Sequence, residues 1–245
     1  MKLLNMKKIY LPFFLAIIFM IIKTKFITKN LDISSAIVYM YNSFEFECLI
    51  DVYSIAVYAI PISIWTFVLG VRCNEFYENY TFLVTRLGGQ AIYNRILIKK
   101  ELIEGFVLIF TTYVGTSLLL FISGHHVIGN IKLILVSFLL NYINVLILVT
   151  IILMLRVYCS FSISMTNALF VQIALLAIGL FLKYFQLDNL NFLNPMLNNI
   201  MYFHGEPGGN GILILNREIT MNVLMLGVLL FYNMIFLGKR RNLNA

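Results

Sequence analysis

Histidine, cysteine and serine side chains are the groups best able to catalyse a reaction or bind a metal in this 245-residue chain. No histidine lies in an H-E-x-x-H motif, the cysteines show no C-x-x-C spacing, and no G-x-S-x-G turn presents a serine nucleophile. The histidines and cysteines are His125, His126, His204, Cys48, Cys73 and Cys159. We therefore predict that the chain is not an enzyme and has no metal site.

The segment 72–101 instead concentrates charge between two long apolar runs. Advancing 100° per residue from Phe76 places apolar side chains on one side of a helix over about 74–87, and polar side chains on another. The apolar side holds Phe76, Tyr77, Tyr80, Leu83, Val84 and Leu87, and the polar side holds Glu75, Asn79 and Arg86. This pattern predicts an amphipathic helix that is too polar to span a membrane.

Phe82 departs from the pattern because it lies among the polar residues. An exposed aromatic side chain in a charged surround is a candidate anchor for a partner protein. The alternative is that Phe82 packs on a neighbouring loop or on lipid headgroups. After the helix, Gly88 and Gly89 predict a C-terminal cap in left-handed backbone, and a second helix can begin at Gln90. Such a glycine corner would hold the first helix at a fixed angle beneath the membrane.

Arg95, Lys99 and Lys100 follow the corner and have a simpler interpretation. Lysines and arginines that flank a span commonly anchor its cytoplasmic end on anionic headgroups. The amphipathic helix, Phe82 and the glycine corner are not explained by such anchoring.

Bulk composition places the chain among integral membrane proteins. It is 61% hydrophobic and only 12% charged, and its mean hydropathy is +0.90. The formal charge of +7 could suggest nucleic acid, but basic residues at cytoplasmic helix ends supply the same excess. We predict contact with membrane lipid and none with nucleic acid.

Six apolar segments predict an all-α membrane domain that occupies the whole chain, 1–245. The segment 102–122 would reach about 31 Å as a helix, which matches a hydrocarbon core of about 30 Å. The first segment would reach only about 21 Å, so it must extend into its flanking lysines to cross. The predicted spans are 9–22, 52–71, 102–122, 131–155, 162–182 and 221–237.

The distribution of basic residues favours a cytoplasmic location for both chain ends. With that orientation, about two thirds of the 18 lysines and arginines fall on the inner side, as the positive-inside rule requires. Lys23, Lys25 and Lys29 argue for the opposite orientation, since they directly follow the first span. The segment 72–101 would then be cytoplasmic and the segment 183–220 extracellular.

Two acids and two prolines are candidates for a pathway or a gate. Asp51 and Glu104 lie at the edges of the second and third spans, where an acid facing lipid is costly, so they could line a path or pair with lysines. Pro61 interrupts the hydrogen bonding of the second span. Pro195 follows Asn194, a pair that predicts the start of a short helix over 196–203.

The outer segment 183–220 continues past that helix with the turn sequence EPGGNG and an apolar run, Ile212–Leu215. These features predict a pair of short helices at the membrane surface. They could shape the exit for an amphipathic substrate, or they could merely cap the bundle.

The stretch EFYENYTFLVTRLGGQAIYNRILIKKEL resembles the first cytoplasmic loop of the permease subunits of ABC transporters of the six-span exporter class. In that family the loop carries a coupling helix that docks into the ATP-hydrolysing subunit. The resemblance implies a docking surface at Glu75, Glu78, Phe82 and Arg86. Family members often have a proline where this chain has Gly88-Gly89, which leaves the register of the contact open.

The resemblance also implies partners, because the chain lacks the G-x-x-x-x-G-K-[ST] loop that would bind a nucleotide. A separate ABC ATPase would bind ATP and Mg²⁺, and a second permease copy or a homologous permease would complete the pathway. Small permeases of this class often export peptides or protect against antimicrobial peptides, and a lipid or drug would fit equally well. The competing hypotheses are a stand-alone immunity protein that binds a toxin, and a channel.

Overall fold

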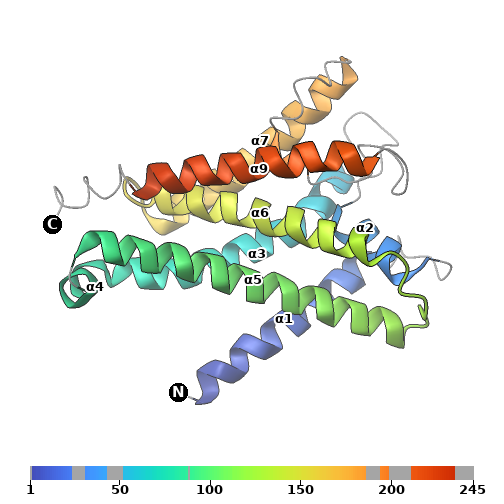
Figure 1. Ribbon diagram of the computed structural model, residues 1–245, viewed down its shortest axis with the longest axis horizontal. Helices are drawn as coiled ribbons and strands as arrows, with labels where there is room; N and C mark the ends of the chain where they lie inside the picture. The colour runs from blue at the N-terminus through green and yellow to red at the C-terminus, as the bar shows by residue number, and fades with distance from the viewer. Residues whose placement is uncertain are drawn as a thin grey trace.

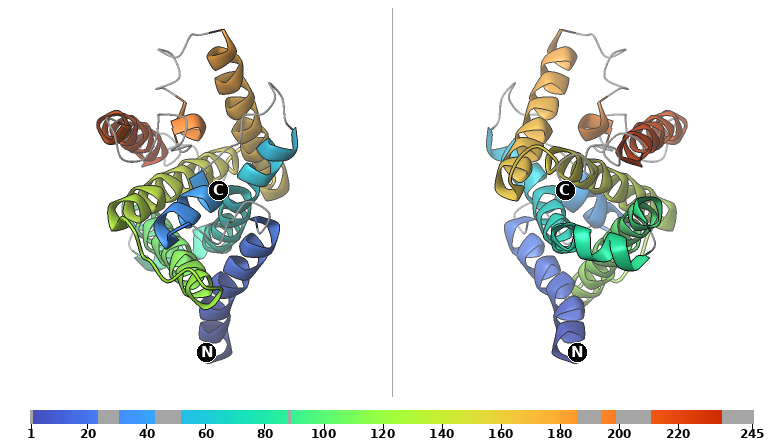
Figure 2. Two further views of the ribbon diagram at one scale, coloured as in Figure 1. Left: turned by 90° about the vertical axis from the view of Figure 1, so that its right-hand side faces the viewer. Right: turned by 90° about the vertical axis from the view of Figure 1, so that its left-hand side faces the viewer.

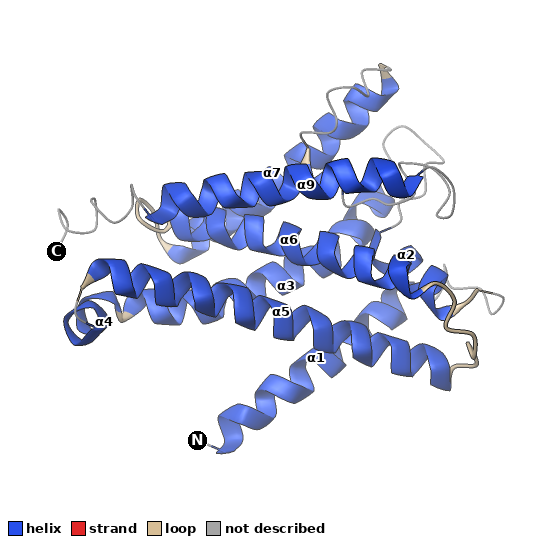
Figure 3. Cartoon of the chain, viewed as in Figure 1, coloured by secondary structure: helices blue, strands red, loops and turns tan. Residues whose placement is uncertain are grey.

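The structure is a computed structural model that describes residues 2–23, 31–42, 52–87, 89–185, 194–198 and 211–234. Every regular element in these ranges is a helix, as Figure 3 shows, which confirms the predicted all-α fold. The helices are α1 (Lys2–Lys23), α2 (Ile33–Asn42), α3 (Val52–Glu78), α4 (Tyr80–Leu87), α5 (Gln90–Ile122), α6 (Ile131–Leu155), α7 (Phe161–Tyr184), α8 (Pro195–Asn198) and α9 (Gly211–Tyr232).

Three helical stretches in the described ranges are long and apolar enough to cross a membrane: Gln90–Ile122, Ile131–Leu155 and Phe161–Gly179. Two shorter apolar stretches, Leu11–Ile22 and Ile219–Tyr232, lie in α1 and α9. The chain is therefore built as a membrane-embedded protein.

Helix α6 lies at the centre of the bundle. Of its most apolar stretch, 72% is buried inside the protein, against 44% for α5 and 28% for α7. Helices α2, α3, α5, α7 and α9 all pack on it, and α1 packs on α5 (Figure 1). Helices α7 and α9 diverge from each other beyond α6 (Figure 2). The packing around α6 thus sets the frame for the other helices.

The predicted amphipathic helix over 74–87 is wrong as a single element. Helix α3 continues from the second predicted span as far as Glu78, and α4 begins at Tyr80. Asn79 lies between them. Its side-chain amide donates to the Glu75 carbonyl (2.8 Å), and its own carbonyl accepts from the Leu83 amide of α4 (2.9 Å). An Asn side chain bonded to nearby backbone in this way competes with the regular helical ladder.

Helix α2 was not predicted from the sequence. Asp32 caps its N-terminus, since Oδ1 accepts from the Ser35 amide (2.6 Å) and from the Ser34 hydroxyl (3.0 Å). Burial raises the pKa of Asp32, but the hydrogen bonds from Ser35 and Ser34 outweigh that effect and hold the pKa below its ordinary value. The start of α2 is also tied to the α5–α6 connection, where His125 Nδ1 lies 2.7 Å from the Leu31 carbonyl oxygen.

The other end of α2 is held by a buried polar network. Asn42 Oδ1 accepts from the Ser137 hydroxyl and from Asn141 Nδ2 (3.1 Å). Asn141 Nδ2 also donates to the Tyr113 hydroxyl (2.7 Å), which lies 2.7 Å from Ser137 Oγ. All four side chains are buried, and the network joins α2 and α5 to α6.

The segment between the fifth and sixth predicted spans is described only in part. Asn194 caps α8 as predicted, since its Oδ1 accepts from the Met196 amide (3.1 Å). The predicted remainder of that helix, 199–203, and the first five residues of the turn EPGGNG, 206–210, lie outside the described residues. The apolar run Ile212–Leu215 is not a separate element, because α9 already begins at Gly211. The last helix therefore starts ten residues before the predicted span 221–237.

Gly105 allows α3, α5 and α6 to approach closely. A Cβ atom there would lie 3.0 Å from Leu69 Cδ2 and 3.3 Å from Leu146 Cδ2, whereas one at the exposed Gly227 would meet nothing within 4 Å. We expect Gly105→Val to destabilise the protein by about 1–3 kcal/mol through overpacking, and Gly227→Val to have little effect. Thermal unfolding in detergent measures both, and equal melting temperatures for the two variants would contradict this packing.

Candidate functional site

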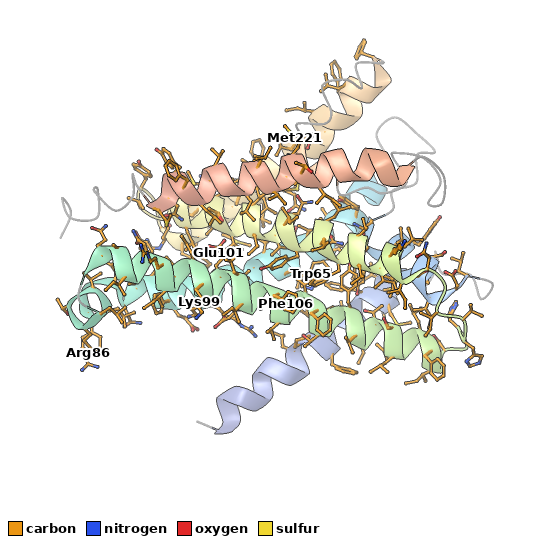
Figure 4. The ribbon with its side chains drawn as sticks, viewed as in Figure 1. Trp65, Arg86, Lys99, Glu101, Phe106 and Met221 are labelled. Carbon is orange, nitrogen blue, oxygen red and sulfur yellow. The ribbon has the colours of Figure 1, made fainter. Side chains whose placement is uncertain are left out.

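The segment Arg72–Glu101, which we call the elbow, lies at one end of the bundle. The end of α3, all of α4 and the first turns of α5 form it, and α4 is the extreme element at that end (Figure 1). Arg86, on the last turn of α4, points away from the bundle (Figure 4). Helix α1 begins and α9 ends toward this same end (Figure 1).

Phe76, Tyr80 and Tyr93 form an aromatic cluster, which we call the brace, that packs α3, α4 and α5 together in the elbow. The Phe76 and Tyr93 rings stack with centroids 5.1 Å apart, and the Tyr80 ring meets Tyr93 edge-on at 4.9 Å. The Tyr93 hydroxyl also donates to the Phe76 carbonyl (3.3 Å), so α5 is tied directly to α3. Most of the predicted apolar side packs against the core, namely Phe76, Tyr80, Leu83, Val84 and Leu87.

The four residues of the implied docking surface lie on the opposite, outer side. Glu75, Glu78 and Arg86 are exposed, and the Phe82 side chain is 54% exposed. The Arg86 guanidinium lies 4.1 Å from the Phe82 ring centroid, a cation–π contact. The exposed residues of the elbow thus include two carboxylates, and an aromatic ring that is covered by a cation. The predicted exposure of Phe82 is confirmed, and the role of the face in docking stays a prediction.

A polar relay connects this outer face to α6. Arg156, the residue that ends α6, donates from Nε to Asn74 Oδ1 (3.0 Å). Asn74 Nδ2 in turn donates to Glu78 Oε1 (2.7 Å), and the Arg156 guanidinium lies 5.4 Å from the Tyr77 ring centroid. One carboxylate of the face is thus oriented by a side chain that is itself held by the central helix.

Gly89 makes the corner between α4 and α5. Its φ of +133° lies in a region that L side chains rarely adopt, and its amide donates to the Val84 carbonyl (3.1 Å). A bond of this span is one of the two that close a Schellman cap, and the helix ends before the two glycines as predicted, while the predicted left-handed backbone of the cap would fall at Gly88. Gly88 lies outside the described residues. Helix α5 then begins at Gln90, as expected.

The basic residues of the elbow divide into two kinds. Arg95 and Lys99 are exposed, as residues anchoring on headgroups would be. Lys100 is half-buried instead, and its Nζ donates to the Arg72 carbonyl (3.0 Å) and lies 5.0 Å from the Phe76 ring centroid. Lys100 therefore helps to fix α5 against the end of α3.

The four candidates for a pathway or gate are placed as follows. Asp51 lies outside the described residues. Pro61 is buried inside α3 and Pro195 is buried at the first position of α8, and these helices meet where the Tyr58 hydroxyl donates to the Met196 carbonyl (3.2 Å). Glu104 is half-buried nearer the elbow, beside Gly105, and its buried Oε2 has no hydrogen-bond partner within the described ranges.

Glu101 is a residue that sequence reasoning did not single out. Figure 4 labels its position on α5. Glu101 is 1% exposed, and its Oε1 accepts from the Thr150 hydroxyl of α6 (2.7 Å). Its Oε2 has no hydrogen-bond partner among the parts of the chain described. The only signal in the sequence was an acid directly beside the apolar run that begins at Leu102. A buried carboxyl therefore joins the elbow end of α5 to the central helix.

No cluster of three or more His, Cys, Asp or Glu side chains within the described ranges could hold a metal ion. Comparison of the chain with known protein families found no match, and comparisons with curated proteins and with solved structures found none either. The function is therefore inferred from the geometry of the elbow and the bundle.

Replacing a side chain of the brace with alanine should destabilise the protein much more than replacing a side chain of the outer face. Tyr93 is fully buried and Phe82 is largely exposed. We expect Tyr93→Ala to cost about 3–5 kcal/mol of stability, as for other buried aromatic residues, and Phe82→Ala to cost little. Thermal unfolding in detergent, with limited proteolysis to monitor the elbow, tests the difference. A Phe82→Ala variant as unstable as Tyr93→Ala would show that Phe82 belongs to the brace.

Proposed function

We propose that the chain is the permease subunit of an ATP-driven exporter, with six spans and both ends in the cytoplasm. Helices α1, α3 and α9 would supply the three spans beyond α5, α6 and α7. The location of the start of α1 and the end of α9 toward the elbow end supports this topology (Figure 1). A second permease copy would complete the conduit, and ATP with Mg²⁺ would be bound by a separate ABC ATPase.

The observation that carries the proposal is an exposed face of charged and aromatic side chains on a helix that is packed firmly against its neighbours. Phe82 and its charged neighbours are exposed, while the opposite side of α4 is fixed to α3 and α5 by the stacked ring of Tyr93. Phe82 lies outside the predicted spans, so the hydrocarbon core of the membrane would not cover its exposed ring. A large aromatic side chain among charges is typical of the anchors that dominate binding energy in protein interfaces.

The composition of the face defines the partner that would fit it. Phe82 requires an apolar pocket, and Glu75 and Glu78 require basic side chains near its rim. Because Asn74 already holds one oxygen of Glu78 (2.7 Å), this carboxylate is partly preorganised and loses less side-chain freedom on binding. The ATPase subunit would accordingly present a groove with a positive rim at the cytoplasmic membrane surface.

The mechanical step follows from the same contacts. Closure of the ATPase subunits on ATP would displace α4, and the brace at Tyr93 would pass the movement to α5. Glu101 and Thr150 would carry it to α6 through their hydrogen bond (2.7 Å). The cargo would be hydrophobic or amphipathic, such as an antimicrobial peptide, a lipid or a drug, since ionisable side chains are few in the predicted spans.

Purification of the tagged full-length chain from its own host in mild detergent tests the proposal. We expect an ATP-hydrolysing subunit to be retained, and the double variant Glu78→Ala with Phe82→Ala to lower its retention at least tenfold. Phe67→Ala is a matched control, because Phe67 is 52% exposed but lies within the second predicted span. Mass spectrometry identifies the retained subunit, and ATPase assays measure its amount.

Two outcomes would contradict the proposal. Failure of the wild-type chain to retain any ATPase would refute the permease hypothesis and favour a stand-alone immunity protein, or a channel if the protein conducts ions in bilayers without nucleotide. Retention that is equal in the double variant and in Phe67→Ala would refute the docking face alone.

A further inference from the structure

An apolar groove runs between α5 and α6 on the outside of the bundle. Its volume is about 560 Å³. One wall is a stripe along α5, the other is formed by α6, and buried Tyr113 and Phe138 form the floor. The α5 wall holds Phe106, Phe110, Val114, Leu118 and Phe121, and the α6 wall holds Ile134, Leu135 and Leu139.

The groove lies in the part of the chain that would face lipid. Its α5 and α6 walls belong to stretches that are long and apolar enough to cross a membrane. Aromatic contacts keep the groove in shape, since the Phe106 and Phe138 rings meet edge-on at 5.3 Å, and Phe106 and Phe110 stack at 5.6 Å. Tyr113 is further fixed by its hydroxyl, which lies 2.7 Å from Ser137 Oγ.

The length and the lining of the groove suit a hydrocarbon chain. From Phe106 to Phe121 the α5 wall extends about 22 Å at 1.5 Å per residue. Apart from the hydroxyls of Tyr113 and Ser117, the side chains that line the groove are apolar. A length of about 22 Å also exceeds one leaflet of hydrocarbon, about 15 Å, so a full acyl chain can lie along the wall.

Polar groups that suit a phosphate lie at the end of the groove away from the elbow. Exposed Lys132 is one turn before Leu135 on the same face of α6, and the exposed His126 ring lies 5.4 Å from the Phe121 ring. Asp32, next to the lining residue Ile33, is an acid and would not bind a phosphate; its Oδ1 caps α2 by accepting from the Ser34 hydroxyl (3.0 Å) and the Ser35 amide. A cation at the polar end of an apolar groove matches the chemistry of a phospholipid.

We propose that this groove binds one acyl chain of a phospholipid from the surrounding leaflet, with the lipid phosphate at Lys132 and His126. The bound chain fills the space above Tyr113, and Tyr113 belongs to the network that holds α2 on α6. The bound lipid therefore stabilises the packing of α5 on α6 at the end of the bundle away from the elbow. This site is independent of the elbow and of any ATPase.

Native mass spectrometry of the delipidated full-length protein titrated with dipalmitoyl phosphatidylglycerol tests the proposal. We expect one tightly bound lipid, and Val114→Trp should weaken binding at least tenfold because the indole fills the groove. Val107→Trp is a matched control, since Val107 is 45% exposed on α5 against 41% for Val114 but does not line the groove. Leu139→Trp blocks the opposite wall in case Val114→Trp fails to fold.

Separate variants and lipids test the headgroup contact. Lys132→Gln should weaken binding about threefold to tenfold, whereas Lys99→Gln, exposed at the elbow, should not. Dipalmitoylglycerol, which lacks a phosphate, should bind to the wild type at least as weakly as phosphatidylglycerol binds to Lys132→Gln. The proposal is refuted if Val114→Trp and Leu139→Trp both bind lipid like Val107→Trp. It is also refuted if these two variants disrupt a dimer while lipid binding is unchanged, because the groove would then accommodate a second copy.

Discussion

Hydrogen bonds between buried polar side chains fix the register of this bundle, because apolar contacts alone cannot do so in a lipid environment. Lipid tails are as apolar as leucine, so helices gain little by exchanging lipid for each other. The network of Asn42, Ser137, Asn141 and Tyr113 supplies a specific alternative, since each of these groups would be costly to leave without a partner. It attaches α2 and α5 to α6, and α6 in turn contacts most of the other helices. Close approach at Gly105 adds α3 to the same frame.

The position of the elbow follows from that frame. Helix α5 is continuous from Gln90 to Ile122, so the helix that contributes Tyr113 to the buried network also contributes its first turns to the elbow. Tyr93 and Lys100 hold the end of α3 on it, and Arg156 reaches the elbow from α6 through Asn74. The outer face of α4 is therefore presented at a defined angle rather than on a loose loop.

The sequence was most informative where a strong local signal and tertiary packing agree. Hydropathy located α5, α6 and α7 closely, because long apolar runs have few other structures available in lipid. The apolar side of the elbow was also predictable from helical periodicity, and the corner from the backbone freedom of its glycines. Phe82 was recognised as exposed for the same reason, since it breaks the periodicity.

The sequence was least informative where distant contacts decide the structure. Helix α2 has ten residues, too few for a span, and its polar ends are satisfied by Ser137 and by the α5–α6 connection, which lie far along the chain. The break at Asn79, whose side chain bonds to the Glu75 carbonyl, interrupts the helix at one residue, and periodicity does not detect it. Glu101 was not assigned a role because its partner, Thr150, is 49 residues away.

The central claim is that the exposed face of α4 is the docking surface for a separate ATPase. The most direct measurement replaces Phe82 with the photoreactive analogue p-benzoylphenylalanine, irradiates cells that express the full chain, and identifies the cross-linked product by mass spectrometry. We predict a covalent product with a subunit that contains a G-x-x-x-x-G-K-[ST] phosphate loop, and no such product when the analogue replaces Phe67. Cross-links from position 82 to lipid alone, or to proteins without a nucleotide-binding loop, would contradict the claim.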